Sequence, residues 1–473
     1  MHNILPKSKK IEDVGRVQSY PPEFSISDNF SREKEQFFKV TVKKIFGIEL
    51  VEGKRGILVC CDDTLPSNAY GIFSDETAIR VFVSSDEGLG YAFSTLLQLI
   101  KKGKRGIGFP ILKLFDYPDR DYRGLMVDVA RKWHDFDCLL EYIDVCFLCK
   151  IKYFHIHFID DQAYTLPSAV LPKLPSEKSY SFEQITRLNE YARIRGVQIV
   201  PEIETVGHCI CFLDAYPEIF KCVETEGEKY EGFSINGVAK QNNVVCPGNE
   251  NVRVLMRRLL EEIASLFPYS DFLHLGGDEA SIKVWETCSV CQAYMREKKL
   301  CGAEELYGEY LGELASFVLS IGKTPIVWEG FSKEVSRFIP KQTVVMAWES
   351  YYNLAPDLLQ DGFQIVNCSW KPLYIVPYAS WTVRSIKKWD IFRWQHWWKQ
   401  SKAYGKGIIV PETVQVLGGQ LCAWECTYEQ EREKIIRNLP IVADRTWNIH
   451  SAEQSYRGKT ARIYRIIKKL TEK

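Results

Sequence analysis

Short hydrophobic runs alternate with segments of helical periodicity along most of the chain after residue 122. About eight runs predict strands: 122–130, 153–160, 197–204, 272–279, 324–330, 343–350, 363–370 and 418–425. Three of the segments between them predict helices: 135–150, 181–196 and 251–267. Strands that alternate with helices favour a parallel sheet, and eight of them close an α/β fold into a (β/α)8 TIM barrel. The alternative is an open doubly wound sheet, but its glycine-rich dinucleotide fingerprint is missing.

The pattern before residue 118 is different. β-branched and aromatic alternation predicts strands at 36–60 and 78–84, and residues 88–103 have helical spacing with a terminal glycine. The polar segment 113–124 contains Pro118 and is typical of a connector. We therefore predict a small α+β domain over 1–117, followed by the barrel over 118–473.

The charge balance excludes two classes of partner. Lys and Arg number 61, as do Asp and Glu, so no net field attracts nucleic acid or an anionic membrane. No apolar run of roughly 18 residues predicts a membrane span, and the opening MHNILPKSKKIEDV lacks the apolar segment of a secretory signal. We expect a cytoplasmic protein. The sequence indicates no subunit number.

Fifteen cysteines in a long chain without a signal are expected to stay reduced. Cys146 and Cys149 lie three positions apart on a predicted helix, and Cys288 and Cys291 form a second CxxC pair that could give thiolates to zinc. The two pairs occupy separate segments with no further paired ligands nearby. We therefore expect free thiols, no bound metal and no cofactor.

Polar and aromatic residues gather where the predicted strands end. These residues are Asp128, Arg131, Asp160, Asp161, Glu202, Glu204, Asp278, Glu279, Trp328, Glu329, Trp348, Glu349, Trp370, Trp424 and Glu425. In a closed parallel barrel the strand ends share one face, which is where such folds bind ligands. Indole rings beside carboxylates suit a sugar, whose C–H bonds lie on an aromatic face while its hydroxyls form hydrogen bonds. Core packing is the alternative for any single tryptophan.

The adjacent carboxyl groups of Asp278 and Glu279 suggest a particular reaction. Two-carboxylate glycosidases hold their carboxyl groups ~5 to 9.5 Å apart across the scissile bond, whereas neighbours on one strand point to opposite faces. A 2-acetamido sugar can instead supply its own nucleophile, the acetamide carbonyl oxygen. Glu279 would then donate a proton to the glycosidic oxygen, while Asp278 orients the acetamide and offsets positive charge. Mutual repulsion favours one charged and one protonated carboxyl.

Four motifs resemble glycoside hydrolase family 20, the β-N-acetylhexosaminidases: RGLMVDVARKW, HIHFIDDQ, PEIETVGH and HLGGDEA. The resemblance implies a barrel after a non-catalytic α+β domain, and retaining, exo-acting hydrolysis of glycans that end in β-linked GlcNAc or GalNAc. It implies catalytic roles for Glu279 and Asp278. It implies substrate contacts for Arg123, Asp160, His208, Trp328, Trp348, Tyr374, Trp424 and Glu425.

The chain departs from the family pattern at two strands. Tyr374 is followed by Ile375 and Val376, where the family commonly has Tyr-x-Asp, and Glu425 follows Trp424 directly, where it commonly has Trp-x-Glu. The C4 configuration of the preferred sugar therefore stays open.

Two alternative functions and one unexplained segment remain. A metal-dependent hydrolase could use His155, His157, His208, His274 and Asp278, although both histidines of HIHFIDD precede their strand end and should hydrogen-bond inside the barrel. A non-catalytic sugar-binding barrel would not require Glu279. The tryptophan-rich segment 381–398 could pack on the barrel or contact a leaving group, a lipid-linked glycan or another subunit.

Overall fold

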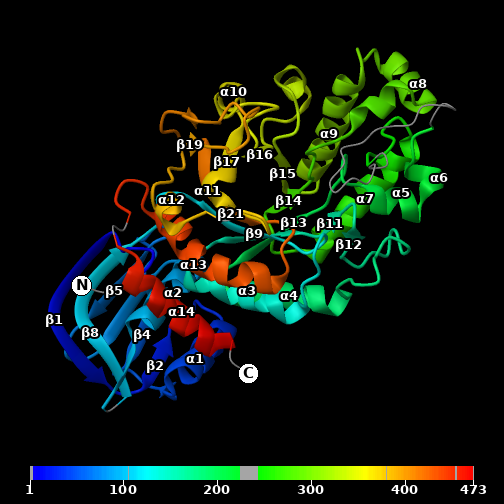
Figure 1. The fold of residues 1–473 in the computed structure, drawn as a ribbon. Coiled ribbons are helices and arrows are strands. Elements are labelled where there is room, and N and C mark those ends of the chain that lie inside the picture. The colour runs from blue at the N-terminus through cyan, green and yellow to red at the C-terminus, as the bar shows by residue number, and fades with distance from the viewer. Residues whose placement is uncertain (1–3, 105, 224–242, 380, 453–454, 472–473) are drawn as a thin grey trace.

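A computed structural model describes residues 4–104, 106–223, 243–379, 381–452 and 455–471 as two units in contact (Figure 1). The larger unit is a ring of eight strands in which every pairing is parallel, and pairing between its seventh and eighth strands closes the ring. The strands are β9 (Tyr122–Asp128), β10 (Tyr153–His157), β13 (Gln198–Glu202), β14 (Phe272–His274), β15 (Thr324–Trp328), β16 (Val344–Ala347), β17 (Gln364–Asn367) and β21 (Val416–Ala423). Each predicted run contributes one of them, so the predicted barrel is confirmed.

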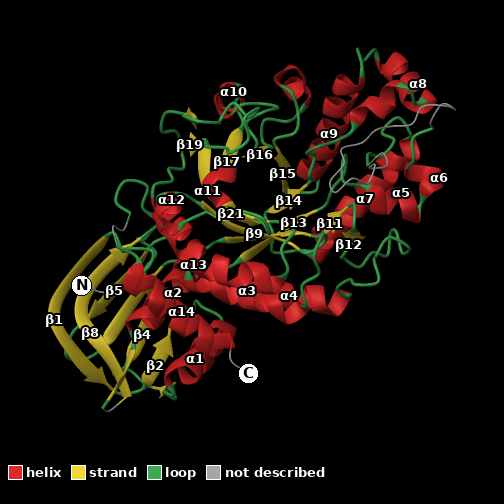
Figure 2. Cartoon of the chain, in the orientation of Figure 1, coloured by secondary structure: helices red, strands yellow, loops and turns green. Residues whose placement is uncertain are grey.

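Helices and short elements connect the barrel strands (Figure 2). The longer helices are α3 (Phe136–Leu148), α4 (Phe182–Arg195), α7 (Glu250–Leu266), α8 (Ser289–Lys298), α9 (Ala303–Ser320) and α13 (Tyr428–Trp447). The shorter ones are α5 (Ile210–Ala215), α6 (Pro217–Phe220), α10 (Ala355–Gln360), α11 (Trp370–Leu373), α12 (Val383–Lys387), η1 (Ile282–Glu286) and η2 (Lys333–Phe338). Four short strands and one strand beside the barrel complete the unit: β11 (Ile159–Asp160), β12 (Ala163–Tyr164), β19 (Arg393–Trp394), β20 (Ile408–Ile409) and β18 (Tyr374–Ile375).

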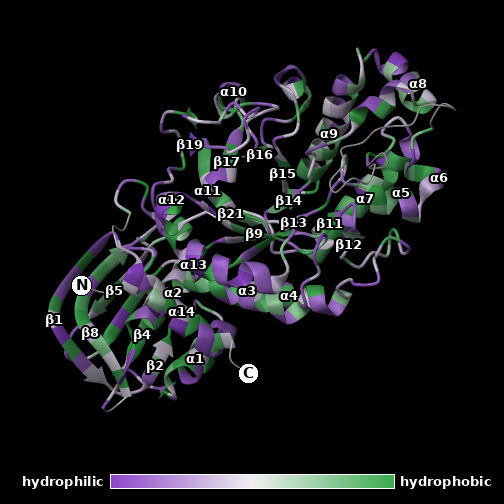
Figure 3. Ribbon diagram, viewed as in Figure 1, coloured by the Kyte–Doolittle hydropathy of each residue, from purple (hydrophilic) through white to green (hydrophobic). Residues whose placement is uncertain are grey.

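Local sequence signals explain where several helices begin and end. Ser181 and Gln184 form a capping box at α4, because each side chain bonds the backbone N–H of the other residue. Thr427 and Gln430 form a second one at α13. Along α4 and α14 (Arg457–Thr471), hydrophobic and hydrophilic residues alternate in the manner of helices with one buried face (Figure 3). Among the described helices, none is both long and apolar enough to cross a bilayer.

The smaller unit is an eight-stranded mixed sheet with two helices. Its strands are β1 (Lys10–Tyr20), β2 (Glu23–Ile26), β3 (Val51–Glu52), β4 (Ile57–Cys61), β5 (Tyr70–Ser74), β6 (Ile79–Val83), β7 (Lys101–Gly103) and β8 (Gly106–Asp116). Its helices are α1 (Arg32–Phe46) and α2 (Asp86–Leu99). The last helix of the chain, α14, returns to this unit and packs on α1 and α2 (Figure 1). The proposed boundary at residue 117 stays a prediction.

Two predictions for the smaller unit are wrong. Residues 36–46 are helical rather than extended: Ser31 caps the start of α1, and Gly47 ends it with φ +66°. Phe38, Val42 and Ile45 lie on one buried face at helical spacing, although β-branched residues in the segment also fit a strand. The helix predicted at 88–103 ends at Leu99, so its terminal glycine belongs to β7 instead.

The barrel interior is filled rather than hollow. At the start of the strands, the rings of Tyr122 and Tyr153 stack with centroids 4.6 Å apart, and Phe272 packs edge-on to Tyr153 at 5.3 Å. Met126 and Val200 are buried in the same cluster. Among the described residues, this packing closes the barrel at the strand starts, so we expect ligands to bind at the opposite end, where the strands end.

A buried ion pair joins the two units. The ammonium of Lys150, which follows α3, lies 3.0 Å from the carboxylate of Asp116 at the end of β8, and both side chains are fully buried. Asp116 also accepts hydrogen bonds from the Tyr70 hydroxyl at 2.7 Å and from Trp447 Nε1 at 2.9 Å. Burial lowers the pKa of Lys150, while the charge on Asp116 acts in the opposite direction. The Lys150 charge therefore depends on Asp116.

We expect Asp116→Asn to lower the free energy of unfolding by ~3 to 5 kcal/mol, because it leaves a buried ammonium without its counterion. Urea unfolding measures the loss, which should shrink at alkaline pH as Lys150 loses its proton. Glu76→Gln removes an exposed ion pair with Arg16 and should leave the unfolding midpoint unchanged. An Asp116→Asn midpoint equal to that of the control would contradict the role of this pair.

Candidate active site

The ends of the barrel strands bring most of the predicted site residues together. Asp278 and Glu279 follow β14, His208 follows β13, and Asp160 ends the short strand that follows β10. Trp348 follows β16, and Trp424 with Glu425 follows β21. The structure therefore confirms that these residues share the mouth of the barrel.

The backbone turns sharply between β14 and the acidic pair. Gly276 and Gly277 have φ values of +65° and +100°, and Glu279 itself has φ +47°. A Cβ on Gly276 would lie 2.0 Å from Oε2 of Glu204, the same oxygen that accepts the Gly277 N–H at 3.2 Å. Glycine is required there because any side chain would collide with that buried carboxyl. The turn ends the strand, so the two neighbouring carboxyl groups need not point to opposite faces.

His208 lies beside both carboxyl groups. Its Nε2 is 3.8 Å from Asp278 Oδ2 and 3.5 Å from Glu279 Oε2, and its Nδ1 is 3.4 Å from Asp160 Oδ1. The side chain of Asp278 is only 11% exposed, whereas that of Glu279 is 49% exposed. The adjacent carboxyls thus occupy unlike environments, one enclosed and one open to the mouth.

A chain of alternating charges leads from the barrel interior to this pair. Glu202 accepts hydrogen bonds from Trp328 Nε1 and from His157 Nδ1, the latter at 2.7 Å. His157 Nε2 lies 3.0 Å from Asp160 Oδ2, and the Arg131 guanidinium lies 2.6 Å from the same oxygen. Each charge in the chain therefore has an opposite charge next to it.

These neighbours decide the protonation of the buried groups. Burial alone would lower the pKa of His157, but the charges of Glu202 and Asp160 outweigh it and raise that pKa well above its usual range. Burial would raise the pKa of Asp160, but Arg131 and His208 hold it well below its usual range. The pKa of His208 is raised well above its usual range because Asp160 outweighs burial. We conclude that Asp160 is ionised and that both imidazoles are charged.

Asp278 differs from Asp160. Burial raises the pKa of Asp278 to about 6; the positive charge of His208 acts to lower it, and the neighbouring charge of Glu279 raises it further. Its Oδ1 is buried and has no hydrogen-bond partner among the described residues. Asp278 is therefore a carboxyl with a pKa raised to about 6 and with a buried oxygen that no described residue hydrogen-bonds.

Aromatic side chains form one wall of the mouth. Tyr374 lies between Trp370 and Trp348, with centroid distances of 4.6 and 6.2 Å and nearly parallel rings. Trp424 completes this wall beside Tyr374 at 6.5 Å, and its buried Nε1 lacks a partner within the described part of the chain. Trp328 lies deeper and is almost fully buried. The flat faces suit a small planar group or a sugar ring.

Arg123 does not belong to this site, so its predicted role is wrong. It is the second residue of β9, at the closed end of the barrel, and its guanidinium donates to the backbone oxygens of Arg120, Asp121 and Lys150. Arg131, eight positions later, lies where the strand has ended. The strand direction alone could have identified Arg131, since ligand contacts come from strand ends.

Arg131 contacts both carboxylates and an aromatic ring of the mouth. Besides Asp160, it lies 3.4 Å from Asp128 and 5.0 Å above the Trp424 ring. Nearby carboxylates, Asp160 and Asp128 foremost and then Glu425, outweigh burial and raise its pKa. A permanent cation therefore stands beside Trp424 in the mouth.

The structure also shows the two places, after Tyr374 and after Trp424, where the sequence departs from the family pattern. Glu425 has φ +59°, and its backbone N–H donates to Asp128 at 3.2 Å, which turns the residue at the end of β21. Its carboxylate is one of the charges acting on Arg131. Cys426 is fully buried, and Val376 is nearly so. Of the two strand-end residues 425 and 426, then, only Glu425 carries a carboxylate, and it lies near Arg131.

Glu329 is a strand-end carboxylate with a structural role. Its two oxygens accept the backbone N–H groups of Trp348, Ser350, Tyr351 and Tyr352 at 2.8 to 3.2 Å. Burial raises its pKa to about 7, against the effect of these donors. It shapes the connection after β16 rather than facing the mouth.

Of the histidines that suggested a metal centre, His155 and His157 lie inside the barrel, as predicted, and His274 lies there too, whereas His208 lies at the mouth. His155 and His274 stack 4.7 Å apart, and both are fully buried. Each lies near Glu202, at 3.0 and 3.3 Å, so these three side chains are close enough to hold an ion. Glu202 already contacts His157 and Trp328, and an ion would compete with those hydrogen bonds.

The tryptophan-rich segment 381–398 is partly core and partly surface. Trp394 is fully buried and donates to Ala347 O at 2.9 Å, and Trp389 is also buried. Trp397 is half exposed and packs edge-on to Trp370 at 5.7 Å. The segment thus packs on the barrel and also presents one indole near the aromatic wall.

Comparison with known proteins identifies the class. The sequence profile described as glycosyl hydrolase family 20, catalytic domain, matches residues 121–449, and the chain belongs to this family. The barrel, its acidic pair and its aromatic wall all lie within the matched residues.

Individual relatives agree with this family. A beta-hexosaminidase of Vibrio furnissii is 30% identical over 337 residues, which is 66% of this chain and 54% of that protein. The beta-hexosaminidase subunit alpha of Mus musculus is 26% identical and covers 75% of this chain and 65% of its own. The chain thus spans about half the length of the Vibrio furnissii relative.

Solved structures show the same fold. The exo beta-N-acetylglucosaminidase of Vibrio harveyi, solved in complex with N-acetylglucosamine, superposes with a TM-score of 0.84 at 22% identity, over 99% of this chain and 77% of its own. The beta-N-acetylhexosaminidase of Bacteroides fragilis superposes with a TM-score of 0.78 at 20% identity. The superposition covers 97% of this chain and 94% of that protein.

We expect the carboxyl of Asp278 to titrate with a pKa of about 6, and to respond to its two charged neighbours in opposite directions. His208→Gln should raise this pKa, because it removes the cation that lowers it, and Glu279→Gln should lower it. Infrared difference spectra between pH values, assigned with Asp278→Asn, measure the shift. Equal values in the two variants would refute this electrostatic description.

Proposed function

We propose that the protein is a retaining exo-β-N-acetylhexosaminidase that removes terminal β-linked GlcNAc or GalNAc by substrate-assisted catalysis. The observation that carries the proposal is the unequal pair beside His208: an enclosed Asp278, one oxygen of which has no hydrogen-bond partner among the described residues, next to a half-exposed Glu279. Family membership and beta-hexosaminidase relatives support the same activity.

In this mechanism Glu279 is the proton donor. Its side chain is open to the mouth, where a glycosidic oxygen and its leaving group would lie. After the bond breaks, the Glu279 carboxylate removes a proton from water, and that water opens the cyclic intermediate. The protonated His208 lies 3.5 Å away and stabilises the carboxylate that forms when the proton has left.

Asp278 acts on the acetamide. With its oxygen accepting the amide N–H, the carbonyl oxygen of the acetamide is directed at the anomeric carbon, and its attack forms an oxazolinium ring. The negative charge of Asp278 then offsets the positive charge of that ring. Trp348, Tyr374 and Trp424 supply flat surfaces for the acetamide, and Tyr374 supplies a hydroxyl for its oxygen.

The other carboxylates of the mouth are poor candidates for a protein nucleophile. Asp160 is engaged by Arg131 and His157, and Asp128 accepts three backbone N–H groups and contacts Arg131. Glu329, at the end of a neighbouring strand, does not face the mouth and is surrounded by backbone donors. These contacts favour a nucleophile supplied by the substrate.

Sugar hydroxyls would be held by Arg131, Asp160 and Glu425. Val376 offers no hydrogen bond at the position where the family commonly has an aspartate, so fewer polar contacts discriminate the C4 hydroxyl. A panel of aryl glycosides that differ at C2 and C4 determines the preference. The expected cytoplasmic location also remains a proposal, which rests on fifteen free cysteine thiols.

Glu279→Gln should reduce kcat/KM by ~10²- to 10⁴-fold for a methylumbelliferyl N-acetylglucosaminide, which needs a proton on its leaving group. The loss should be much smaller for the dinitrophenyl glycoside, whose phenolate leaves without a proton. Glu286→Gln, an exposed residue on the same connection, is the control and should match wild type. Equal losses for both leaving groups would contradict a role as general acid.

The rate should fall steadily as the acetamide is fluorinated, because fluorine makes its carbonyl oxygen a weaker nucleophile. A thiazoline mimic of the cyclised acetamide should inhibit wild type strongly and Asp278→Asn weakly. Kinetics on the mono-, di- and trifluoroacetyl glycosides give the slope of log kcat/KM against the number of fluorine atoms. A flat slope, turnover of the 2-hydroxy glucoside, or a sugar ester trapped on any side chain would overturn substrate assistance.

A further inference from the structure

Four buried cysteines meet at one point outside the mouth of the barrel. They are Cys222, Cys246, Cys288 and Cys291, and their sulfur atoms all lie within 4.8 Å of one another. Cys246 Sγ is 3.7 Å from Cys288 Sγ and 3.5 Å from Cys291 Sγ. Cys222 and Cys246, which form no CxxC pair, thus bring two further sulfur atoms to Cys288 and Cys291.

The sulfur separations distinguish the ways in which four cysteines can associate. A disulfide needs its sulfurs ~2.05 Å apart, which excludes a bond between the pairs measured here. Four thiolates around one zinc ion, each ~2.3 Å from the metal in a tetrahedron, lie roughly 3.8 Å apart. The observed separations match the second arrangement.

We propose that Cys222, Cys246, Cys288 and Cys291 bind one structural zinc ion. Four sulfur ligands complete a tetrahedron and leave no position for water or substrate, so the ion would hold the fold rather than take part in a reaction. On binding, four thiols lose four protons to the solvent, and the thiolates become the ligands. Soft sulfur donors select zinc or iron over magnesium and calcium.

The position of the cluster indicates which segments a bound ion would hold together. Cys222 follows α6 and Cys246 precedes α7, so both belong to the connection that begins after β13 and carries His208. Cys288 and Cys291 lie at the start of α8, in the connection that begins after β14 and carries Asp278 and Glu279. The zinc ion would join the two segments that place the acidic pair beside His208.

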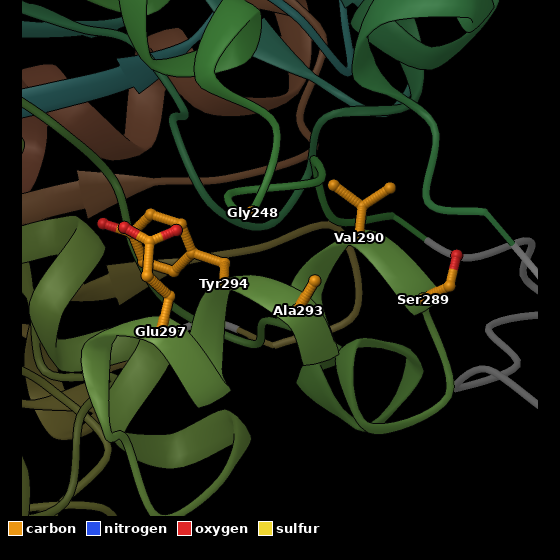
Figure 4. A pocket seen from close by; sticks show the side chains of 6 residues that line it. All are labelled: Gly248, Ser289, Val290, Ala293, Tyr294 and Glu297. Carbon is orange, nitrogen blue, oxygen red and sulfur yellow. The ribbon is translucent and has the colours of Figure 1, made fainter.

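Close packing around the cluster shows that these two connections are fitted to each other. Trp285 Nε1 donates to Val245 O at 2.9 Å, across the two connections. A Cβ on Gly248 would lie 2.7 Å from the Cα of Cys291, so this glycine lets the backbones approach. Gly248 and Val290 also line a pocket with residues of α8, and neither Asp278 nor Glu279 lines it (Figure 4). The four cysteines share no member with the group of His208, Asp278 and Glu279.

Metal analysis of the purified full chain tests the proposal without assuming the enzymatic activity. We expect about one zinc per chain after gel filtration in metal-free buffer. Titration with an organomercurial should release it in step with four thiols. Cobalt grown in place of zinc should give the visible bands of a tetrahedral sulfur site. The proposal would be overturned by zinc at background level or by stoichiometric iron. It would also be overturned if four of the fifteen thiols could not be titrated because they form disulfides.

Variants locate the ion. Cys246→Ser and Cys291→Ser should lose zinc and melt at a lower temperature, whereas Cys246→His, which keeps a zinc ligand, should retain it. Cys149→Ser is the matched control, because Cys149 is buried in the other CxxC pair and should keep full zinc content. If the serine variants do not fold, the wild-type analysis still decides. Zinc retained in soluble Cys246→Ser and Cys291→Ser would refute the assignment.

Chelation separates this role from catalytic metal. A structural ion predicts that wild type bound to the thiazoline mimic loses zinc more slowly, and that stripped enzyme loses activity together with its folded fraction. Activity lost while both the fold and the melting temperature stay unchanged would contradict a structural ion. Zinc loss without any effect on the melting temperature would do the same.

Discussion

The alternating chain of charges from Glu202 to His208 is the interaction on which the site depends. Burying a single carboxylate or imidazolium is unfavourable, but each member of this chain is next to an opposite charge. The chain fixes Asp160 as an anion and His208 as a cation, and this cation lies where the acidic pair needs it. The protonation of Asp278 therefore depends on a chain of charges that begins at Glu202, deep in the barrel.

The backbone conformation also helps to position the side chains of the site. Among the few residues other than glycine with positive φ are His208, Glu279 and Glu425, and each directs its side chain just past the end of a strand. Such a conformation costs of order 1–3 kcal/mol for each residue and persists only where the surroundings enforce it. Two of the three, His208 and Glu279, lie in the connections that meet at the four cysteines. A bound ion there would help to hold the backbone in this conformation.

The features that could be predicted from the sequence are those that depend on local periodicity and on the order of the strands. Eight runs gave the barrel strands, and residues at their ends gave nearly all of the mouth. The motif that contains both Arg123 and Arg131 does not show which arginine faces the ligand; the direction of the strand does, and it favours Arg131. The β-branched residues of α1 suit a strand as well as a helix, so their pattern alone does not identify the helix. The cysteine cluster could not be predicted, since two of its members lie far along the chain from the CxxC pair and only folding brings them together.

The return of α14 to the smaller unit has a consequence for biosynthesis. Its Ile463, Ile466, Ile467 and Leu470 are buried, and Arg462 and Lys469 bond the backbone oxygens of Ile100 and Ile45. During translation at ~5 to 20 residues per second, the face of α1 and α2 that α14 covers stays open for on the order of 20 to 80 seconds. The smaller unit therefore leaves the ribosome before the barrel but is completed only after it, and chaperones have that interval in which to shield it.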